Sequence, residues 1–139
     1  MRVLLDTCVV SEISRPEGLE RVRARVNLFP PAGVFLSVVT IGEFARGVAL
    51  LPPGRRRSGF AALLEQMERD YLDRILSIDV DTARLWGELD AARQRLGRPV
   101  TVSDGLIAAT ALRHGLHVVT RNVRDFVDTG VQIIDPWEE

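Results

Sequence analysis

The sequence predicts an α/β protein of three layers, in which helices cover both faces of a central parallel sheet of four to five strands. Two observations support this prediction. Short apolar runs rich in Val, Leu and Ile alternate along the chain with longer segments whose apolar residues recur at helical spacing. Proline or glycine follows several of these longer segments, where either residue ends a helix. Strands that alternate with helices are typical of a parallel sheet buried on both faces.

The chain begins with one predicted strand and two predicted helices. Residues 2–5 are a short apolar run, which is typical of a buried strand. Residues 7–14 are expected to form a short helix that ends near Arg15, because the residue before a proline avoids the helical conformation. A second helix is expected over residues 17–28, ahead of Pro30-Pro31.

The middle of the chain is predicted to contain one strand and two helices. Residues 34–39 are a continuous β-rich run. A helix is expected from Thr40 to about Leu51, where Pro52-Pro53-Gly54 breaks it. The three arginines at 55–57 are interpreted as a solvated loop. A helix over 59–76 follows, because its apolar residues are spaced by three or four positions: Phe60, Leu64, Met67, Tyr71 and Ile75.

The last part of the chain is predicted to contain two helices, over residues 82–96 and 103–114, each ended by a glycine. The second of them is apolar on nearly every side and rich in alanine, so we expect it to pack closely on the sheet. Three short strands are expected beside these helices, at residues 77–80, 117–120 and 132–134.

Polar side chains occur where a predicted strand ends and the next helix begins. Asp6 ends the first strand, Glu43 lies one turn past the second, and Asp104 opens the apolar helix. Asn122 follows the next strand, with Asp125 just beyond it. Because the carboxyl ends of parallel strands meet at one edge of a sheet, we expect these residues to gather at that edge.

Each acid also has a structural explanation when it is taken alone. Thr40 and Glu43 match a capping box, and Thr101 and Asp104 match a second one. Asp6 fits the N-cap position of the helix that begins at the next residue. The case for a functional site therefore depends on the joint placement of the acids.

Joint placement has an electrostatic cost that indicates a cation. Two carboxylates about 4 Å apart repel each other by roughly 4 kcal/mol at an effective dielectric constant of about 20. A helix N-terminus offsets only about 0.3–1 kcal/mol of this. Oxygen ligands without a histidine or cysteine set favour Mg²⁺ or Mn²⁺ over Zn²⁺. The pattern therefore predicts metal-assisted phosphodiester chemistry.

Composition limits the function classes further. The 139 residues fit one domain, predicted to span 1–139, and no apolar run is long enough to cross a membrane. A single cysteine fits a reducing cytoplasm. All 18 basic residues are arginine, which excludes mechanisms that need a lysine, such as a P-loop or a Schiff base. The net charge of −1 means that any nucleic acid must bind through local patches.

The ordered motifs of the chain resemble PIN-domain proteins, most closely the VapC/FitB-type toxins of type II toxin–antitoxin modules. The resemblance rests on five stretches: residues 4–7 (LLDT), 41–47 (IGEFARG), 103–111 (SDGLIAATA), 120–126 (TRNVRDF) and 135–137 (DPW). It implies a PIN-like fold and a Mg²⁺- or Mn²⁺-dependent endoribonuclease. It also implies a cognate VapB/FitA-type antitoxin and a homodimer.

The same resemblance implies roles for individual residues. Asp6, Glu43 and Asp104 match the three family acids and are expected to be the metal ligands. Asn122 falls where many relatives have an acid, and Asp125 belongs to the Asn-x-x-Asp-Phe form of this branch, so either one is a candidate to complete the catalytic set.

Two other functions compete with the nuclease hypothesis. The first is a PIN fold that has lost its chemistry and only binds RNA or a regulatory partner; the intact Asp6, Glu43 and Asp104 argue against it. The second is a receiver-like signalling domain, which is disfavoured because the chain has no lysine and has Cys8 where a second acid would be expected.

Overall fold

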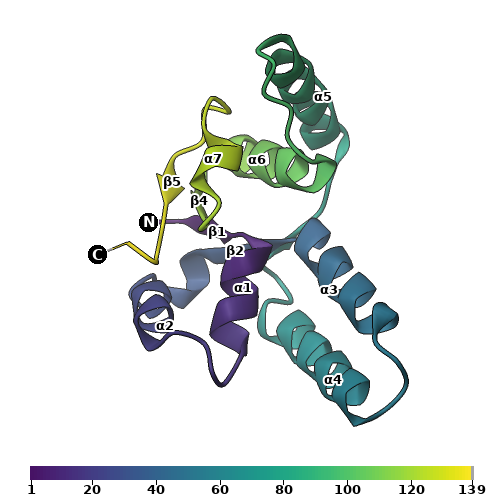
Figure 1. Cartoon of the computed structure of the whole chain (residues 1–139). Helices are drawn as coiled ribbons and strands as arrows, with labels where there is room; N and C mark the ends of the chain where they lie inside the picture. Colours follow the sequence, from purple (N-terminus) through teal and green to yellow (C-terminus); the bar gives the residue numbers. More distant parts are fainter. Residues whose placement is uncertain (139) are drawn as a thin grey trace.

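Across residues 1–138, which the computed structural model describes, five short strands form one parallel sheet (Figure 1). The strands lie in the order β3-β2-β1-β4-β5. They are β1 (Val3–Leu5), β2 (Val34–Ser37), β3 (Ile75–Leu76), β4 (His117–Val119) and β5 (Ile133–Ile134). The predicted α/β class and the parallel sheet are confirmed.

The central strand β1 is buried on both faces of the sheet. Val3 pairs with Val34 of β2 on one side and with His117 of β4 on the other. Because all strands run the same way, their carboxyl ends lie at one edge of the sheet. The predicted site residues come after the strands in sequence and are therefore expected at that edge.

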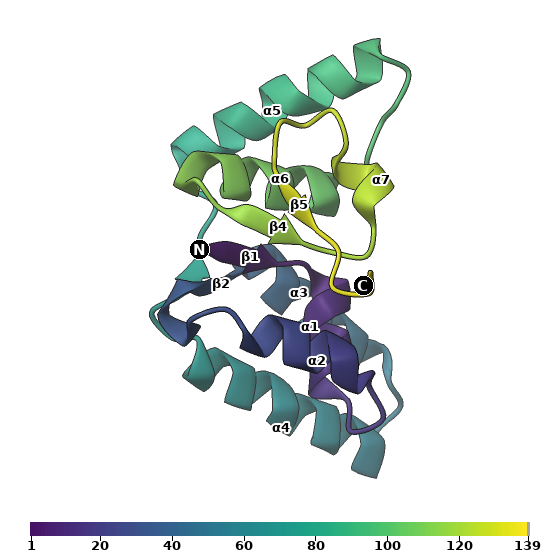
Figure 2. The ribbon, with the colours of Figure 1, turned by 90° about the vertical axis from the view of Figure 1, so that its left-hand side faces the viewer.

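Seven α-helices in the described part of the chain form the outer layers. In Figure 2, α5 and α6 lie on one side of the sheet, and α1, α2 and α4 lie on the other. The helices are α1 (Thr7–Ser14), α2 (Glu20–Asn27), α3 (Val38–Leu50), α4 (Arg55–Asp70), α5 (Val80–Arg95), α6 (Val102–His114) and α7 (Val123–Phe126). None of them has both the length and the apolarity that a bilayer crossing requires.

Two apolar cores separate the layers because neighbouring strand residues point to opposite faces. Val3 and Leu5 pack in one core with residues of α1, α2 and α4. Leu4 packs in the other core, where Ile107 of α6 and Phe126 of α7 are fully buried. Helix α6 also buries a row of alanines, which confirms its predicted close packing on the sheet.

Three local predictions are wrong. The strand expected at 77–80 lies instead at 75–76, where Leu36 and Ser37 pair with it. The helix expected at 59–76 begins at Arg55, so the arginine triplet forms its first turn rather than a loop. Ser37, rather than Thr40, caps α3: its hydroxyl accepts a hydrogen bond from the amide of Val39 at 3.0 Å.

Other local predictions are confirmed. Asp6 caps α1, and the hydroxyl of Thr101 caps α6 by accepting a hydrogen bond from the amide of Asp104 at 3.2 Å. Gly115 ends α6 in the left-handed conformation, with φ of 67°. These caps fix where α1 and α6 begin, and both helices begin at the carboxyl edge of the sheet.

Candidate active site

A cleft of about 470 Å³ opens at the carboxyl edge of the sheet. Its walls come from the starts of α1, α3 and α6 and from the loop that follows β4. The lining residues are mainly oxygen donors: Asp6, Thr7, Cys8, Ser11, Glu43, Thr101, Ser103, Asp104 and Asn122. We call this the acid cleft.

Asp6 is the most firmly held of the acids. Its side chain is 3% exposed, and its backbone amide donates to the carbonyl of Val119 in the neighbouring strand at 2.9 Å. Oδ1 accepts from the amide of Thr7 at 2.8 Å, and Oδ2 accepts from the hydroxyl of Thr120 at 2.7 Å. Oδ1 has a second lone pair that no other contact uses, so Asp6 keeps capacity for a ligand.

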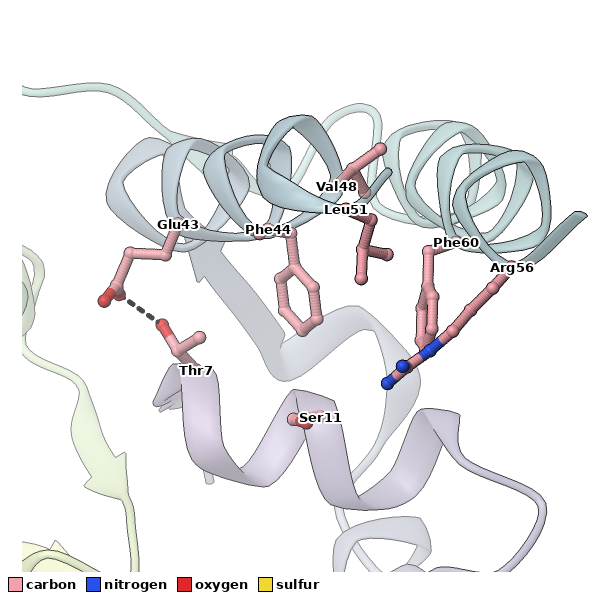
Figure 3. Close-up of a pocket in the computed structure, with 9 residues that line it drawn as sticks. Thr7, Ser11, Glu43, Phe44, Val48, Leu51, Arg56 and Phe60 are labelled. Atoms are coloured by element: carbon pink, nitrogen blue, oxygen red, sulfur yellow. Dashed lines mark hydrogen bonds between the residues drawn. The ribbon is translucent and has the colours of Figure 1, made fainter. Parts of the chain in front are cut away.

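Glu43 reaches the cleft from the second turn of α3. The hydroxyl of Thr7 donates to Glu43 Oε1 at 2.7 Å (Figure 3). The same hydroxyl lies 3.0 Å from Thr40 Oγ1. Because a hydroxyl has one proton to donate, Thr40 must be the donor in that second contact. A relay from Thr40 through Thr7 therefore orients a carboxylate that is otherwise exposed.

Asp104 stands in the first turn of α6 in an unfavourable electrostatic setting. The pKa of its carboxyl is raised from 3.8 to about 6, chiefly by burial and next by the nearby charge of Asp6. Asp125 and Glu43 raise the same pKa, while hydrogen bonding by Thr101 opposes it. The cleft thus concentrates negative charge where a cation would be stabilised.

Two residues, Asn122 and Asp125, are candidates to complete the set of catalytic residues. Asn122 lines the acid cleft, and its backbone amide donates to the hydroxyl of Thr120 at 2.9 Å. Asp125 lies in α7 and borders a neighbouring cavity instead, although its charge raises the pKa of Asp104. Of the two candidates, Asn122 is the one that the fold places among the three acids.

The thiol of Cys8 is a passive part of the wall. Its Sγ lies 3.6 Å from Asp6 Oδ2 and 3.7 Å from Thr120 Oγ1. Burial and the charge of Asp6 raise the pKa of the thiol above its usual 9.0. The neutral thiol is therefore favoured, and a reactive thiolate is not.

The donor set fits a hydrated hard cation. Within residues 1–138, no three Asp, Glu, His or Cys side chains form a group that could hold a metal ion by themselves. Mg²⁺ usually keeps several waters and takes only one or two carboxylates from the protein. Oxygen ligands spaced around a polar cleft fit this coordination of Mg²⁺. They do not fit a closed zinc site with four protein ligands.

Thr120 is the site residue that sequence reasoning missed. It is fully buried, and its hydroxyl serves Asp6, Asn122 and Cys8 at once. The signal for it was a threonine directly after a buried strand. Its partner Asp6 is 114 positions away in sequence, so the contact itself was not predictable.

An apolar groove of about 300 Å³ adjoins the acid cleft (Figure 3). It lies between α1, α3 and α4 and shares Thr7, Ser11 and Glu43 with the cleft. Its remaining lining is mostly apolar: Phe44, Gly47, Val48, Leu51, Arg56 and Phe60. We call it the apolar groove.

Comparison with known proteins places the chain in a family. The PIN domain family model matches residues 3–131. The chain is 36% identical over 137 residues to the VapC ribonuclease Y4jK of Sinorhizobium fredii, with 98% of each chain covered. It is also 36% identical over 141 residues to toxin FitB of Neisseria gonorrhoeae, with 99% of each covered.

The fold agrees with these sequence relationships. The crystal structure of FitAcB from Neisseria gonorrhoeae superposes with a TM-score of 0.91, at 36% identity and with 99% of each chain covered. Solved structures of similar chains include toxin–antitoxin complexes. The chain therefore belongs to the PIN-domain family and is related over its full length to the VapC/FitB toxins of toxin–antitoxin systems.

Proposed function

We propose that this chain is a Mg²⁺- or Mn²⁺-dependent endoribonuclease, the toxin of a type II toxin–antitoxin module. The observation that carries the proposal is the gathering of Asp6, Glu43 and Asp104 around one cleft, with the pKa of Asp104 raised by burial and by the other acids. The relative from Sinorhizobium fredii is named a VapC ribonuclease, and the one from Neisseria gonorrhoeae is named a toxin.

In this proposal, Asp6, Glu43 and Asp104 hold the ion in part through its water ligands, and Asn122 contributes from the loop after β4. When bound, the ion supplies Lewis-acid polarisation of a phosphate oxygen and a water of lowered pKa. Asp125 contributes to the negative field at Asp104 from outside the cleft.

Hydrogen bonds from neighbouring residues hold the acids in position. Thr120 and the amide of Thr7 hold Asp6, and the hydroxyl of Thr7 holds Glu43. None of the residues that line the acid cleft is a histidine. Three acids would repel an RNA phosphate, so the cleft accepts its substrate only when their charge is neutralised.

The proposed partner is a cognate VapB/FitA-type antitoxin, and the toxin is proposed to form a homodimer. The apolar groove supports the partner proposal, because a segment lying in it would contact Thr7 and Glu43, which also line the acid cleft. An antitoxin seated there would cover the site. Co-expression with the antitoxin should therefore abolish cleavage, and Phe44→Ala should weaken the complex.

The decisive experiment measures RNA cleavage by the purified chain with Mn²⁺, with Mg²⁺ and with a chelator. We expect cleavage with either ion, none with chelator, and none for Asp6→Asn at unchanged circular dichroism. Cleavage that persists in chelator, or in a folded Asp6→Asn variant, would contradict the proposal. RNA binding without any cleavage under all conditions would favour the inactive binding module instead.

A further inference from the structure

A second polar cavity, of about 670 Å³, lies beside the acid cleft. The connection from α5 to α6 runs down beside α7 (Figure 2), and the cavity lies between these segments. Its lining is Arg93, Gly97, Arg98, Pro99, Val123, Arg124, Asp125, Val127 and Asp128. We call it the arginine cavity.

Two stretches of chain that line the arginine cavity continue into the acid cleft. Residues 97–99 are separated from Thr101 by Val100 alone, and residues 123–125 directly follow Asn122. Thr101 and Asn122 both line the acid cleft. A strand of nucleic acid that crosses the cleft therefore passes the mouth of the arginine cavity.

Arg93 is the unusual residue of this cavity. It is 4% exposed, and Nη1 donates its hydrogen bond to the carbonyl of Val127. Nε is buried and has no hydrogen-bond partner within residues 1–138. Buried polar groups are nearly always paired, and an unpaired one costs about 1–3 kcal/mol. Arg93 thus keeps one unused donor, Nε, and places a buried positive charge at the wall of the cavity.

The charges of the cavity favour an anion. Three arginines face two aspartates there, which leaves a net charge of +1. Arg98 and Arg93 converge on the carboxylate of Asp128, and the Arg93 contact is 3.8 Å long. Arg124 is exposed at the rim. A phosphodiester carries one negative charge, and its oxygens match the planar fork of arginine donors.

We propose that the arginine cavity binds a phosphate of the RNA strand next to the one that is cleaved. The inference rests on the proposed ribonuclease function and adds how the substrate is held. Arg98 and Arg124 contact the RNA backbone and make no contact with the bases, and the buried charge of Arg93 lies behind them. Contacts of this kind fix the register of a strand independently of its sequence. They also explain how a chain with a net charge of −1 attracts a polyanion.

The first test measures binding without chemistry. Fluorescence anisotropy of a labelled oligouridylate of about 12 nucleotides, a length typical of single-strand sites, is recorded in chelator. We expect Arg98→Gln with Arg124→Gln to weaken binding about 3- to 10-fold and to lower the slope of log K against log salt by about 0.7 per lost contact. Arg84→Gln is the control for the loss of one positive charge, since Arg84 is exposed on α5, the helix that carries Arg93, and does not line the cavity.

The second test identifies the phosphate. Single phosphates of the oligouridylate are replaced in turn by neutral methylphosphonates. For the unmodified chain we expect one position beside the cleavage site to lose affinity, and for Arg98→Gln with Arg124→Gln we expect no further loss there. Additive losses at every position, or an equal effect of Arg84→Gln, would overturn the inference. So would variants that weaken antitoxin binding and leave RNA binding unchanged, because the cavity would then be a protein site.

The two proposals fail in different ways. If the chain binds oligouridylate with the expected dependence on Arg98 and Arg124 but does not cleave RNA with Mn²⁺, the ribonuclease proposal is wrong and the phosphate contact stands. If the chain cleaves RNA and the arginine variants bind it as Arg84→Gln does, the phosphate contact is wrong and the ribonuclease proposal stands.

Discussion

Charged residues make different contacts at the two ends of the parallel strands. We call the side formed by the amino ends of the strands the amino edge, and the side formed by their carboxyl ends the carboxyl edge. At the amino edge, charges pair with the backbone: Arg74 Nη1 donates to the carbonyls of Pro31 at 2.6 Å and Val34 at 2.8 Å. Arg2 Nη1 donates to the carbonyl of His114 at 3.2 Å. At the carboxyl edge, Asp6 and Asp104 lie close enough that one raises the pKa of the other.

This difference separates residues that stabilise the fold from residues that serve a ligand. Hydrogen bonds from Arg2 and Arg74 to carbonyls hold the amino ends of the strands together. Like charges at the carboxyl edge destabilise the chain until something neutralises them. His117 starts β4 at the amino ends of the strands, away from the acids.

The largest expected effect compares one aspartate from each edge. Asp104→Asn should lower RNA cleavage by about 100-fold or more, since it removes a proposed metal ligand and even outer-shell changes at metal sites cost about 10- to 100-fold. Asp73→Asn should leave cleavage within about twofold, because the Asp73 side chain is 90% exposed just ahead of β3. Initial rates at saturating Mn²⁺ measure both. Equal losses would erase the distinction between the edges.

Thr120 tests how firmly Asp6 must be held. Thr120→Val removes the 2.7 Å hydrogen bond to Asp6 Oδ2 and should lower the free energy of unfolding by about 1.5–3 kcal/mol, since the acceptor is a carboxylate. Cleavage should fall about 10-fold or more. Urea unfolding and cleavage rates check the two effects. Thr120→Ser keeps the hydroxyl and should recover most of both; failure to recover would mean that shape, rather than the hydrogen bond, matters.

Gly33 tests the amino edge for a purely structural role. A Cβ at this position would lie 2.8 Å from the carbonyl oxygen of Met1, which belongs to the backbone and cannot move cheaply. Gly33→Ala should therefore lower the free energy of unfolding by about 1–3 kcal/mol. Cleavage per folded molecule should not change, as measured at a temperature where the variant is fully folded. A loss of specific activity would show that the amino edge also serves the site.

The pH dependence of stability gives the smallest expected effect. The pKa of Asp104 is about 6 in the folded chain and near 3.8 when unfolded, so between these values the folded state binds more protons. Stability of the metal-free protein should therefore fall as pH rises from about 4 to 6. Asp104→Asn should remove this loss and gain roughly 1 kcal/mol at pH 7, because water screens a half-buried carboxyl. Urea unfolding at pH 5 and pH 7 in chelator would reveal a wrong sign.

The sequence allowed the layers of the fold and most of the caps to be predicted because these depend on local chemistry. Asp6 before α1 and Gly115 after α6 carry their structural role in their residue type. Strand β3 was misplaced because it consists of two residues and is defined by its pairing with Leu36 and Ser37. Helix α4 begins earlier than expected because arginine is a good helix former, despite the charge of its first turn.

The residues of the acid cleft were expected to gather because parallel strands share an edge, and the structure brings Asp6, Glu43, Asp104 and Asn122 together there. Their roles as metal ligands and catalytic groups stay predictions. The supporting contacts of Thr120 and the buried guanidinium of Arg93 were not predictable, because both depend on partners far along the chain.

Direct measurement of Mn²⁺ binding shows whether the acids at the carboxyl edge of the sheet share one cation. Titration of the metal-free chain with Mn²⁺, followed by the electron paramagnetic resonance signal of free ion and by the melting temperature, needs no RNA. We expect saturable binding that raises the melting temperature, with both effects lost in Asp104→Asn and kept in Asp73→Asn. Binding that is equal in all three proteins, or absent from the unmodified chain, would contradict this expectation.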